Sequence, residues 1–228
     1  MLSRTLVVVG GLSNSSWNLG NIAKQIVGIG NPAFVYRNDS TFMRTLTVSE
    51  CIDWIKTVGL NADPDALRVS LPGHDAQLVF TVRWPRILPY QVPYFASLFL
   101  PGNPSEIDEC VFLLSDNGAC GVLDFELASR MLGLLRDTHD EKRAPLDSPA
   151  YVLSRGDSVD ARMLVTMALL FSWDCYIVPQ HGRFFVWIDD DEAADVWCKT
   201  REDYGSLVAK FKKFGIVPEE APEIRAGN

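Results

Sequence analysis

The sequence predicts an α+β fold, in which antiparallel or mixed sheets pack against helices. Segments with helical apolar periodicity alternate along the chain with short β-branched runs of period two. Hydrophobic residues make up 47% of the chain and charged residues 22%, which are ordinary proportions for a folded protein. The 228 residues suffice for one large domain or for two small subdomains.

The first hundred residues read as an α/β-like region. The run RTLVVVGG predicts a first strand, WNLGNIAKQIVGIG a helix and AFVYRN a second strand. The segment TVSECIDWIKTVGL predicts an amphipathic helix, which Thr47 or Ser49 caps and Gly59 ends. Residues 66–84 then alternate in two runs, each of which predicts a strand.

A proline-rich stretch separates this region from an acidic second half. PRILPYQVPYFASLFLPGNP holds five prolines, so we expect an irregular bridge or a domain boundary at residues 85–105. Residues 1–100 carry eight Lys and Arg against six Asp and Glu, a net charge of +2. Residues 101–228 carry thirteen against twenty-three, a net charge of −10. The expected domains are residues 1–100 and 101–228, and one continuous domain is the alternative.

The second half predicts two hairpins and three helices. ECVFLLSD and ACGVLDF flank an Asn-Gly turn signal, and WDCYIV and RFFVWIDDD flank PQHG. EAADVWCKT and YVLS predict two further strands. Helices are predicted from DFELASRMLGLLRD, with Leu134 on its apolar side, from SVDARMLVTMALLF, with Ser158 as its cap, and from REDYGSLVAKFKKFG.

Cysteine usage and charge indicate a compartment and exclude some partners. The five cysteines are scattered without a CxxC pair, which favours buried, reduced thiols in a cytoplasmic protein. The N-terminal apolar run is too short for a secretory signal, and no stretch approaches the ~20 apolar residues of a membrane span. Without such a stretch we expect no membrane partner. Because the acidic half repels phosphate backbones, we also expect no nucleic-acid partner, but a basic protein.

Catalytic and cofactor signatures of high specificity do not occur in the sequence. GGLSNSS follows the first predicted strand, but it lacks both GxGxxG and the Gly-Lys-Ser/Thr of a phosphate-binding loop. His74, His139 and His181 fall in turn or loop contexts, where we expect solvated side chains. We therefore expect no cofactor, no catalytic residue and no bound metal.

The acidic run in VWIDDDEAADVW is the strongest candidate for a functional site. It predicts a partner-binding surface, a metal site or a solvated strand end. In the metal alternative, a hydrolase would use Asp189 and Asp191, which share one face of a strand, together with His181. In the partner-binding alternative, nearby aromatic residues supply rigid anchors and the carboxylates steer a basic partner. The predicted partner-binding residues are Trp173, Asp174, Trp187, Asp189, Asp190, Asp191, Glu192 and Asp195.

Four stretches between residues 111 and 198 form a pattern: VFLLSDNG, FELASRMLGLLRD, LLFSWDCYIV and RFFVWIDDDE. Trp173 and Asp174 open a strand after a helix, and the next strand ends in an acidic cluster. This pattern resembles small, acidic, uncharacterised bacterial proteins of the polymorphic-toxin immunity kind. In those proteins the acidic cluster often contains a histidine, whereas the cluster of this sequence contains none. The resemblance implies stoichiometric inhibition of a basic toxin by an acidic surface; a non-catalytic adaptor or subunit is a further alternative.

Overall fold

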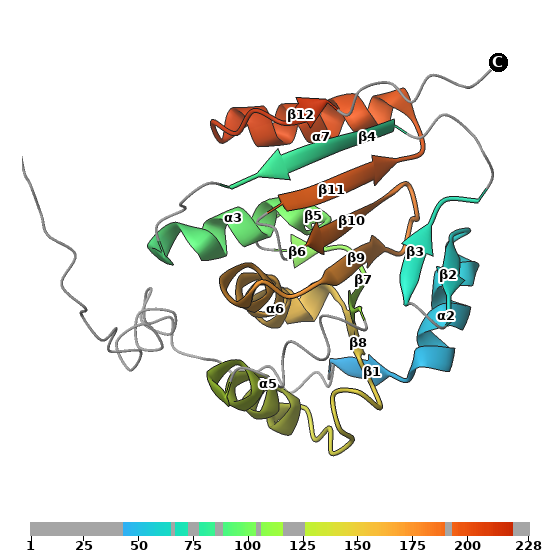
Figure 1. The fold of residues 1–228 in the computed structure, drawn as a ribbon, viewed down its shortest axis with the longest axis vertical. Coiled ribbons are helices and arrows are strands. Elements are labelled where there is room, and N and C mark those ends of the chain that lie inside the picture. Colours follow the sequence, from blue (N-terminus) through green and yellow to red (C-terminus); the bar gives the residue numbers. More distant parts are fainter. Residues whose placement is uncertain are drawn as a thin grey trace, which may run out of the picture. The chain divides into compact units, whose positions relative to one another are not determined.

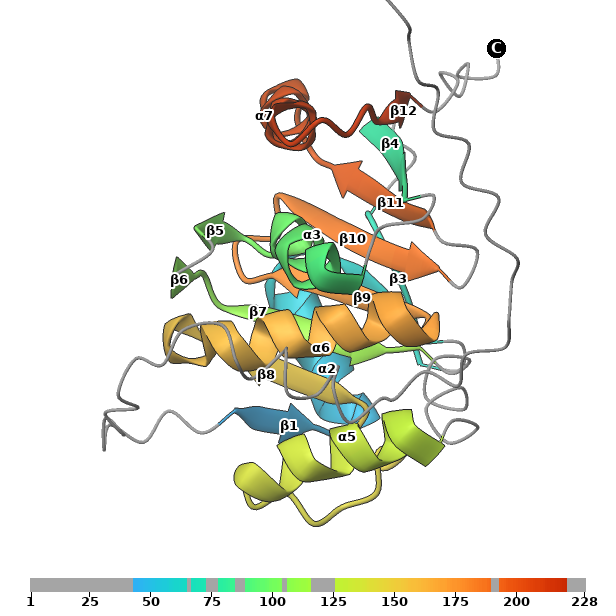
Figure 2. The same ribbon diagram turned by 90° about the vertical axis from the view of Figure 1, so that its left-hand side faces the viewer.

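The centre of the fold is an eight-stranded sheet, in which neighbouring strands pair antiparallel. The computed structural model describes residues 43–64, 67–72, 78–84, 89–103, 106–115, 126–189 and 193–220. In sheet order, the strands are β1 (Arg44–Leu46), β8 (Ala150–Leu153), β7 (Cys110–Leu114), β9 (Cys175–Pro179), β10 (Phe184–Asp189), β11 (Ala193–Cys198), β4 (Leu78–Arg83) and β12 (Glu219–Glu220) (Figure 2). The expected α+β class is confirmed.

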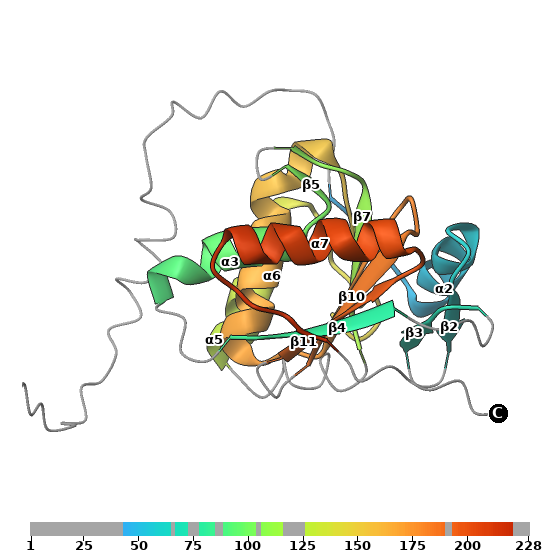
Figure 3. The same ribbon diagram turned by 90° about the horizontal axis from the view of Figure 1, so that it is seen from above.

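Helices cover the two faces of this sheet unequally. One face carries α3 (Val92–Phe99), α5 (Glu126–Thr138), α6 (Ser158–Phe171) and α7 (Arg201–Lys213), and Figure 2 looks onto this helical layer. The opposite face carries α2 (Val48–Thr57) and the two-stranded sheet of β2 (Asn61–Asp63) and β3 (Arg68–Ser70) (Figures 1 and 3). The remaining short elements are the 3-10 helices η1 (Pro89–Gln91) and η2 (Arg155–Asp157) and the strand pair β5 (Gly102–Asn103) and β6 (Glu106–Ile107).

Alternation along the strands divides the core into two clusters. In β10, Val186 and Ile188 point into the cluster under the four helices, whereas Phe185 points to the side of α2. Trp187 follows Phe185 on that second side and packs against its cluster, but it is only partly buried. The face opposite the four helices is therefore the one on which strand side chains reach solvent.

The helix α2 forms where its local signals predict it. The hydroxyl of Thr47 accepts a hydrogen bond from the backbone N–H of Glu50, and the Glu50 carboxylate accepts one from the N–H of Thr47. This reciprocal cap satisfies two of the backbone donors that a helix start leaves without partners. Gly59 follows the helix with a φ of +73°, a conformation that glycine adopts without strain.

The proline-rich stretch differs from its expected irregular structure. It contains η1 and α3, because Pro93 lies in the first turn of α3, where a missing N–H removes no helical hydrogen bond. Strands from both sides of the stretch join one sheet: β4 precedes it in sequence and pairs with β11, which follows it. This pairing brings together residues more than a hundred positions apart.

Two local predictions in the second half are wrong. Leu134 is 68% exposed, because the buried side of α5 carries Ala128, Leu132 and Leu135 instead. Ser158 is the first residue of α6 and not its cap, since η2 precedes it and has its own reciprocal cap between Ser154 and Asp157.

The β9–β10 hairpin, the strands β11 and β8 and the helices α6 and α7 confirm the other predictions for residues 150–215. The elements predicted for residues 1–42, and the turn and second strand predicted for residues 116–125, lie outside the described residues. In the part of the chain that the structure describes, no helix has both the length and the apolarity needed to cross a membrane.

Candidate functional site

Strands β10, β11 and β4 bring tryptophan and aspartate side chains onto one partly exposed surface. Trp187 pairs directly with Asp195 on β11, and Asp195 pairs with Thr81 on β4. In the neighbouring rows, Asp189 pairs with Ala193, and Phe185 pairs with Trp197. Directly paired residues point to the same side of a sheet, and so do residues two apart in one strand. We define the tryptophan–aspartate face as Thr81, Trp187, Asp189, Asp195 and Trp197.

Both tryptophans of this face are held by stacking on a ring from a neighbouring strand. The rings of Trp187 and Tyr176 have centroids 6.3 Å apart and planes 16° apart. Those of Trp197 and Phe185 have centroids 5.8 Å apart and planes 8° apart. Because Tyr176 and Phe185 are buried, each indole is fixed on one side and partly exposed elsewhere.

Asp195 lies between the two tryptophans with a fixed orientation. It pairs with Trp187 across the strands and is two residues from Trp197 along β11. The hydroxyl of Thr81 donates a 2.6 Å hydrogen bond to its Oδ1 atom. This bond leaves lone pairs of the partly exposed carboxylate for another donor. The arrangement places a negative charge beside two aromatic rings.

An ion pair borders the face at the edge of the sheet. Arg83 lies in the same row as Asp189, because both of them pair with Ala193. Its Nε atom is 3.3 Å from Oε2 of Glu219, which pairs with Thr81. Both side chains are more than half exposed, so this pair neutralises charge locally and adds little to stability.

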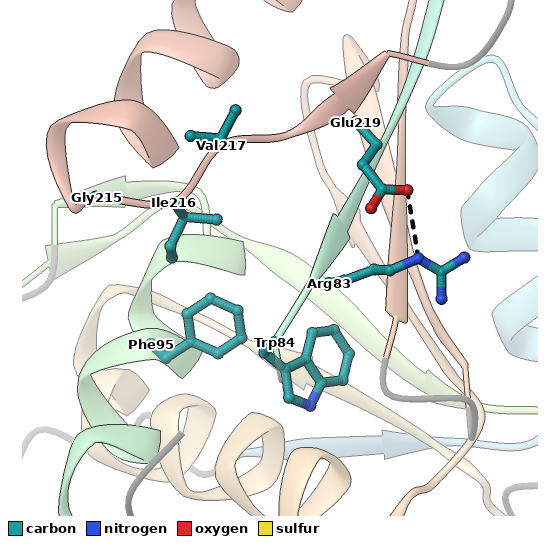
Figure 4. Close-up of a pocket in the computed structure, with 7 residues that line it drawn as sticks. All are labelled: Arg83, Trp84, Phe95, Gly215, Ile216, Val217 and Glu219. Carbon is teal, nitrogen blue, oxygen red and sulfur yellow. Dashed lines mark hydrogen bonds and ion pairs between the residues drawn. The ribbon is translucent and has the colours of Figure 1, made fainter. Parts of the chain in front are cut away.

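Next to this ion pair is an aromatic hollow of about 440 Å³ at the end of β4 (Figure 4). Trp84 and Phe95 form apolar walls, and their ring centroids are 5.6 Å apart. We call this site the edge hollow. Its described lining residues are Arg83, Trp84, Phe95, Gly215, Ile216, Val217 and Glu219. Trp84 and Phe95 belong to the cluster under the helices, so the edge hollow opens on the helical side of the sheet. Arg83 and Glu219, at the edge of the sheet, border both the hollow and the tryptophan–aspartate face.

The structure separates the predicted partner-binding residues. It brings Trp187, Asp189 and Asp195 together on one face. Asp174 is half-buried just before β9, and its carbonyl accepts hydrogen bonds from the backbone and hydroxyl of Ser115. The prediction of Trp173 as a partner-binding residue is wrong. Its side chain is 0% exposed in the core under the helices, so it offers no surface to a partner. Asp190, Asp191 and Glu192 lie outside the described residues.

The predicted combination of Asp189 with His181 is also wrong. His181 lies in the turn before β10, and Asp189 is the last residue of β10. A strand rises about 3.4 Å per residue, so the length of β10 separates them by roughly 17 Å. Burial and the charge of Arg183 lower the pKa of His181. Among the described residues, His, Cys, Asp and Glu side chains do not gather in groups of three or more that could hold a metal.

His139 joins two elements and is not the solvated loop residue that we expected. Its side chain is 11% exposed. Its Nδ1 atom accepts a hydrogen bond from the backbone N–H of Met43 at 3.1 Å, and its Nε2 atom is 3.0 Å from Oδ2 of Asp160. An acceptor at Nδ1 requires the proton of the neutral ring to be on Nε2, where it faces Asp160. His74 lies outside the described residues.

Four cysteines are the buried, apolar side chains that the sequence predicts. Cys51, Cys110, Cys175 and Cys198 are at most 1% exposed and form no disulfide. Burial raises the pKa of Cys51 and of Cys198 to about 12 and moves those of the other two upward as well. Thiols with such pKa values hold their protons at neutral pH and are poor nucleophiles. Cys120 lies outside the described residues.

Residues from β4 and α3 complete the site, and the sequence did not identify them. Thr81 is 114 positions from Asp195, and only the pairing of β4 with β11 brings them together. The sequence contained one signal for Thr81: it is a polar residue within the alternating apolar run LVFTVR. Comparisons with protein-family models, with curated proteins and with solved structures give no match for this chain.

Proposed function

We propose that this protein binds a basic protein stoichiometrically and inhibits it, as immunity proteins inhibit their toxins. The observation that carries the proposal is the direct pairing of Trp187 with Asp195 on a partly exposed sheet face, with Asp189 in the next row. Protein interfaces are enriched in such aromatic side chains. The carboxylates beside them favour a partner of opposite charge.

The charge of the chain supports a basic partner. The second half has a net charge of −10, and the partly exposed Asp189 is the last residue of β10. Exposed charges of one sign accelerate association with an oppositely charged surface through a long-range field. The first half, with a net charge of +2, does not add to this field.

The edge hollow offers further apolar surface at the edge of the sheet, on its helical side. A stable interface buries on the order of 1,200–2,000 Å² in total, which is more than a few side chains supply. Trp84 and Phe95 form apolar walls, and Val217 at the rim is 77% exposed. Tyr94, on the same helix as Phe95, is 59% exposed and packs on Phe214. Of these residues, the exposed Tyr94 and Val217 would offer a partner apolar contacts if it reached around the sheet edge to the helical side.

Co-expression tests this function directly. The most basic product of a neighbouring gene is expressed in a host cell alone and together with this chain. We expect the product alone to arrest growth, the chain to restore growth, and the purified pair to form a 1:1 complex by light scattering.

The double variant Asp189→Asn, Asp195→Asn should restore growth less well than the unmodified chain. Glu126→Gln is the matched control, because Glu126 is 87% exposed on α5, on the helical side of the sheet. Growth restored equally by the double variant, or turnover of the partner by this chain, would contradict stoichiometric inhibition through this face.

A further inference from the structure

The carboxylate of Asp195 has a fixed orientation beside two indole rings. The Thr81 hydroxyl holds its Oδ1 atom, so the side chain does not have to become ordered when a ligand binds. Trp187 lies across from it and Trp197 beside it, and buried rings fix both indoles. A ligand at this carboxylate therefore contacts at least one indole surface.

We propose that the tryptophan–aspartate face binds arginine side chains of the basic partner, with a guanidinium on Asp195 and stacked against Trp187 or Trp197. This inference rests on the proposed function and names the chemistry that the same face selects. A guanidinium is planar, so it can donate hydrogen bonds in its plane to a carboxylate while its flat side covers an aromatic ring. The carboxylate of Asp195 and the indole rings of Trp187 and Trp197 lie next to one another on this face.

Lysine does not match the face as well. Its ammonium group is a compact, strongly hydrated charge that cannot stack on a ring. On a half-buried surface the loss of that hydration weakens binding, whereas a guanidinium is less strongly hydrated. Cation–π contact with tryptophan is the strongest among the aromatic residues, and arginine makes it more often than lysine.

Other charged groups among the described residues also lie near the face. Arg83 is paired with Glu219 at the edge of the sheet. Burial raises the pKa of Tyr176, and the positive charge of Arg68 on β3 offsets part of this rise. Asp189 lies on the same face in the row next to Asp195 and adds negative charge.

The test compares two peptides of equal charge, hexa-arginine and hexa-lysine, as ligands of the full chain. In calorimetric titrations at about 150 mM salt, where long-range steering is largely screened, we expect hexa-arginine to bind about tenfold more tightly. Asp195→Asn keeps the acceptor for Thr81 and removes the charge. It should reduce the affinity for hexa-arginine about tenfold, whereas Glu126→Gln should leave it unchanged.

Nuclear magnetic resonance of the indole N–H groups gives a second readout in the unmodified chain. Hexa-arginine should shift the signals of Trp187 and Trp197, while the signal of Trp173, which is 0% exposed, should stay in place. Trp→Phe variants that keep the thermal transition of the unmodified chain assign the signals.

Equal affinities for the two peptides, or indole signals that do not move, would overturn the selection of arginine. Neither result concerns the growth assay, so the proposed inhibition would stand on its own test. Conversely, tight hexa-arginine binding that depends on Asp195 would support this inference even if the neighbouring gene product proved harmless.

Discussion

Single residues decide which polar groups can reach a ligand and which hold the fold together. Asp195 and Glu141 are both acidic side chains fixed by a threonine, but they differ in their remaining contacts. Asp195 is partly exposed between two tryptophans and has Thr81 as its hydrogen-bond partner. Glu141 is 10% exposed and bonded to Thr45 and Arg143. In our proposal the first carboxylate binds the partner, whereas the second serves the link between β1 and the loop after α5.

The carboxylate of Glu141 should stabilise the fold in a pH-dependent way. Its hydrogen bonds from Arg143 lower its pKa from an ordinary 4.5 to about 2. A lowered folded-state pKa stabilises the fold fully above the ordinary value, and this stabilisation disappears as the pH falls towards 2. Glu141→Gln should therefore reduce the free energy of unfolding by on the order of 2 kcal/mol at pH 7.

Urea unfolding of both proteins between pH 7 and pH 2 measures this difference. The two curves should converge as the pH falls below about 4.5. A difference that stays constant over this range would show that the charge of Glu141 is not what stabilises the link.

The buried thiols give a second test at this scale. In a Cys120→Ser variant, the four remaining cysteines are those that the structure describes as buried. We expect no reaction with a thiol reagent in the native state at pH 8, and four reacting groups after unfolding. Fast native-state reaction of any of the four would contradict its burial.

At the scale of elements, the sequence predicted those whose signals are local. The cap at Thr47, the hairpin of β9 and β10 and the helix α7 each depend on residues close together in the chain. The place of β4 between β11 and β12 depends on pairing over long distances, which a single sequence does not reveal. The alternation around Asp189 was therefore predictable, but Thr81 as the partner of Asp195 was not.

The tryptophans show the same limit. Trp173 and Trp187 both lie beside aspartate or apolar residues near the hairpin, yet one is buried and the other is partly exposed. Trp173 follows the C-cap residue of α6, Ser172, and stacks on Phe171 under the helical layer. Which of the two reaches solvent depends on the helices that pack on one side of the sheet, and not on neighbours in sequence.

The turn between β9 and β10 packs closely on the end of α2. A Cβ atom on Gly182 would lie 2.2 Å from the carbonyl oxygen of Val58, and its φ is +58°. Gly182→Ala should therefore reduce the free energy of unfolding by roughly 2–4 kcal/mol. Gly205→Ala is the matched control, because nothing lies within 4 Å of its added Cβ in α7.

Chemical denaturation should show the control to be neutral or up to about 1 kcal/mol more stable, since alanine favours helices. Equal stability of the two variants would contradict the packing of this turn on α2.

At the scale of the whole molecule, one sheet contains strands from both sides of the proline-rich stretch. β1 and β4 precede it, and β7 to β11 follow it. Residues 89–228 expressed alone would lack β1 and β4 and would leave apolar side chains of the sheet uncovered. We expect this fragment to show no cooperative thermal transition alone and to regain one when it is co-expressed with residues 1–88. A cooperative transition in the isolated fragment would indicate an independent domain.

The most direct measurement is the rate of association with the basic partner from the co-expression assay, taken at several salt concentrations. If the tryptophan–aspartate face steers that partner, the association rate should fall as salt rises, because salt screens exposed charges over about 8–10 Å. The variant Asp189→Asn, Asp195→Asn should associate more slowly and with a flatter salt dependence, while Glu126→Gln should match the unmodified chain. Equal rates and equal salt dependence for all three proteins would contradict binding through this face.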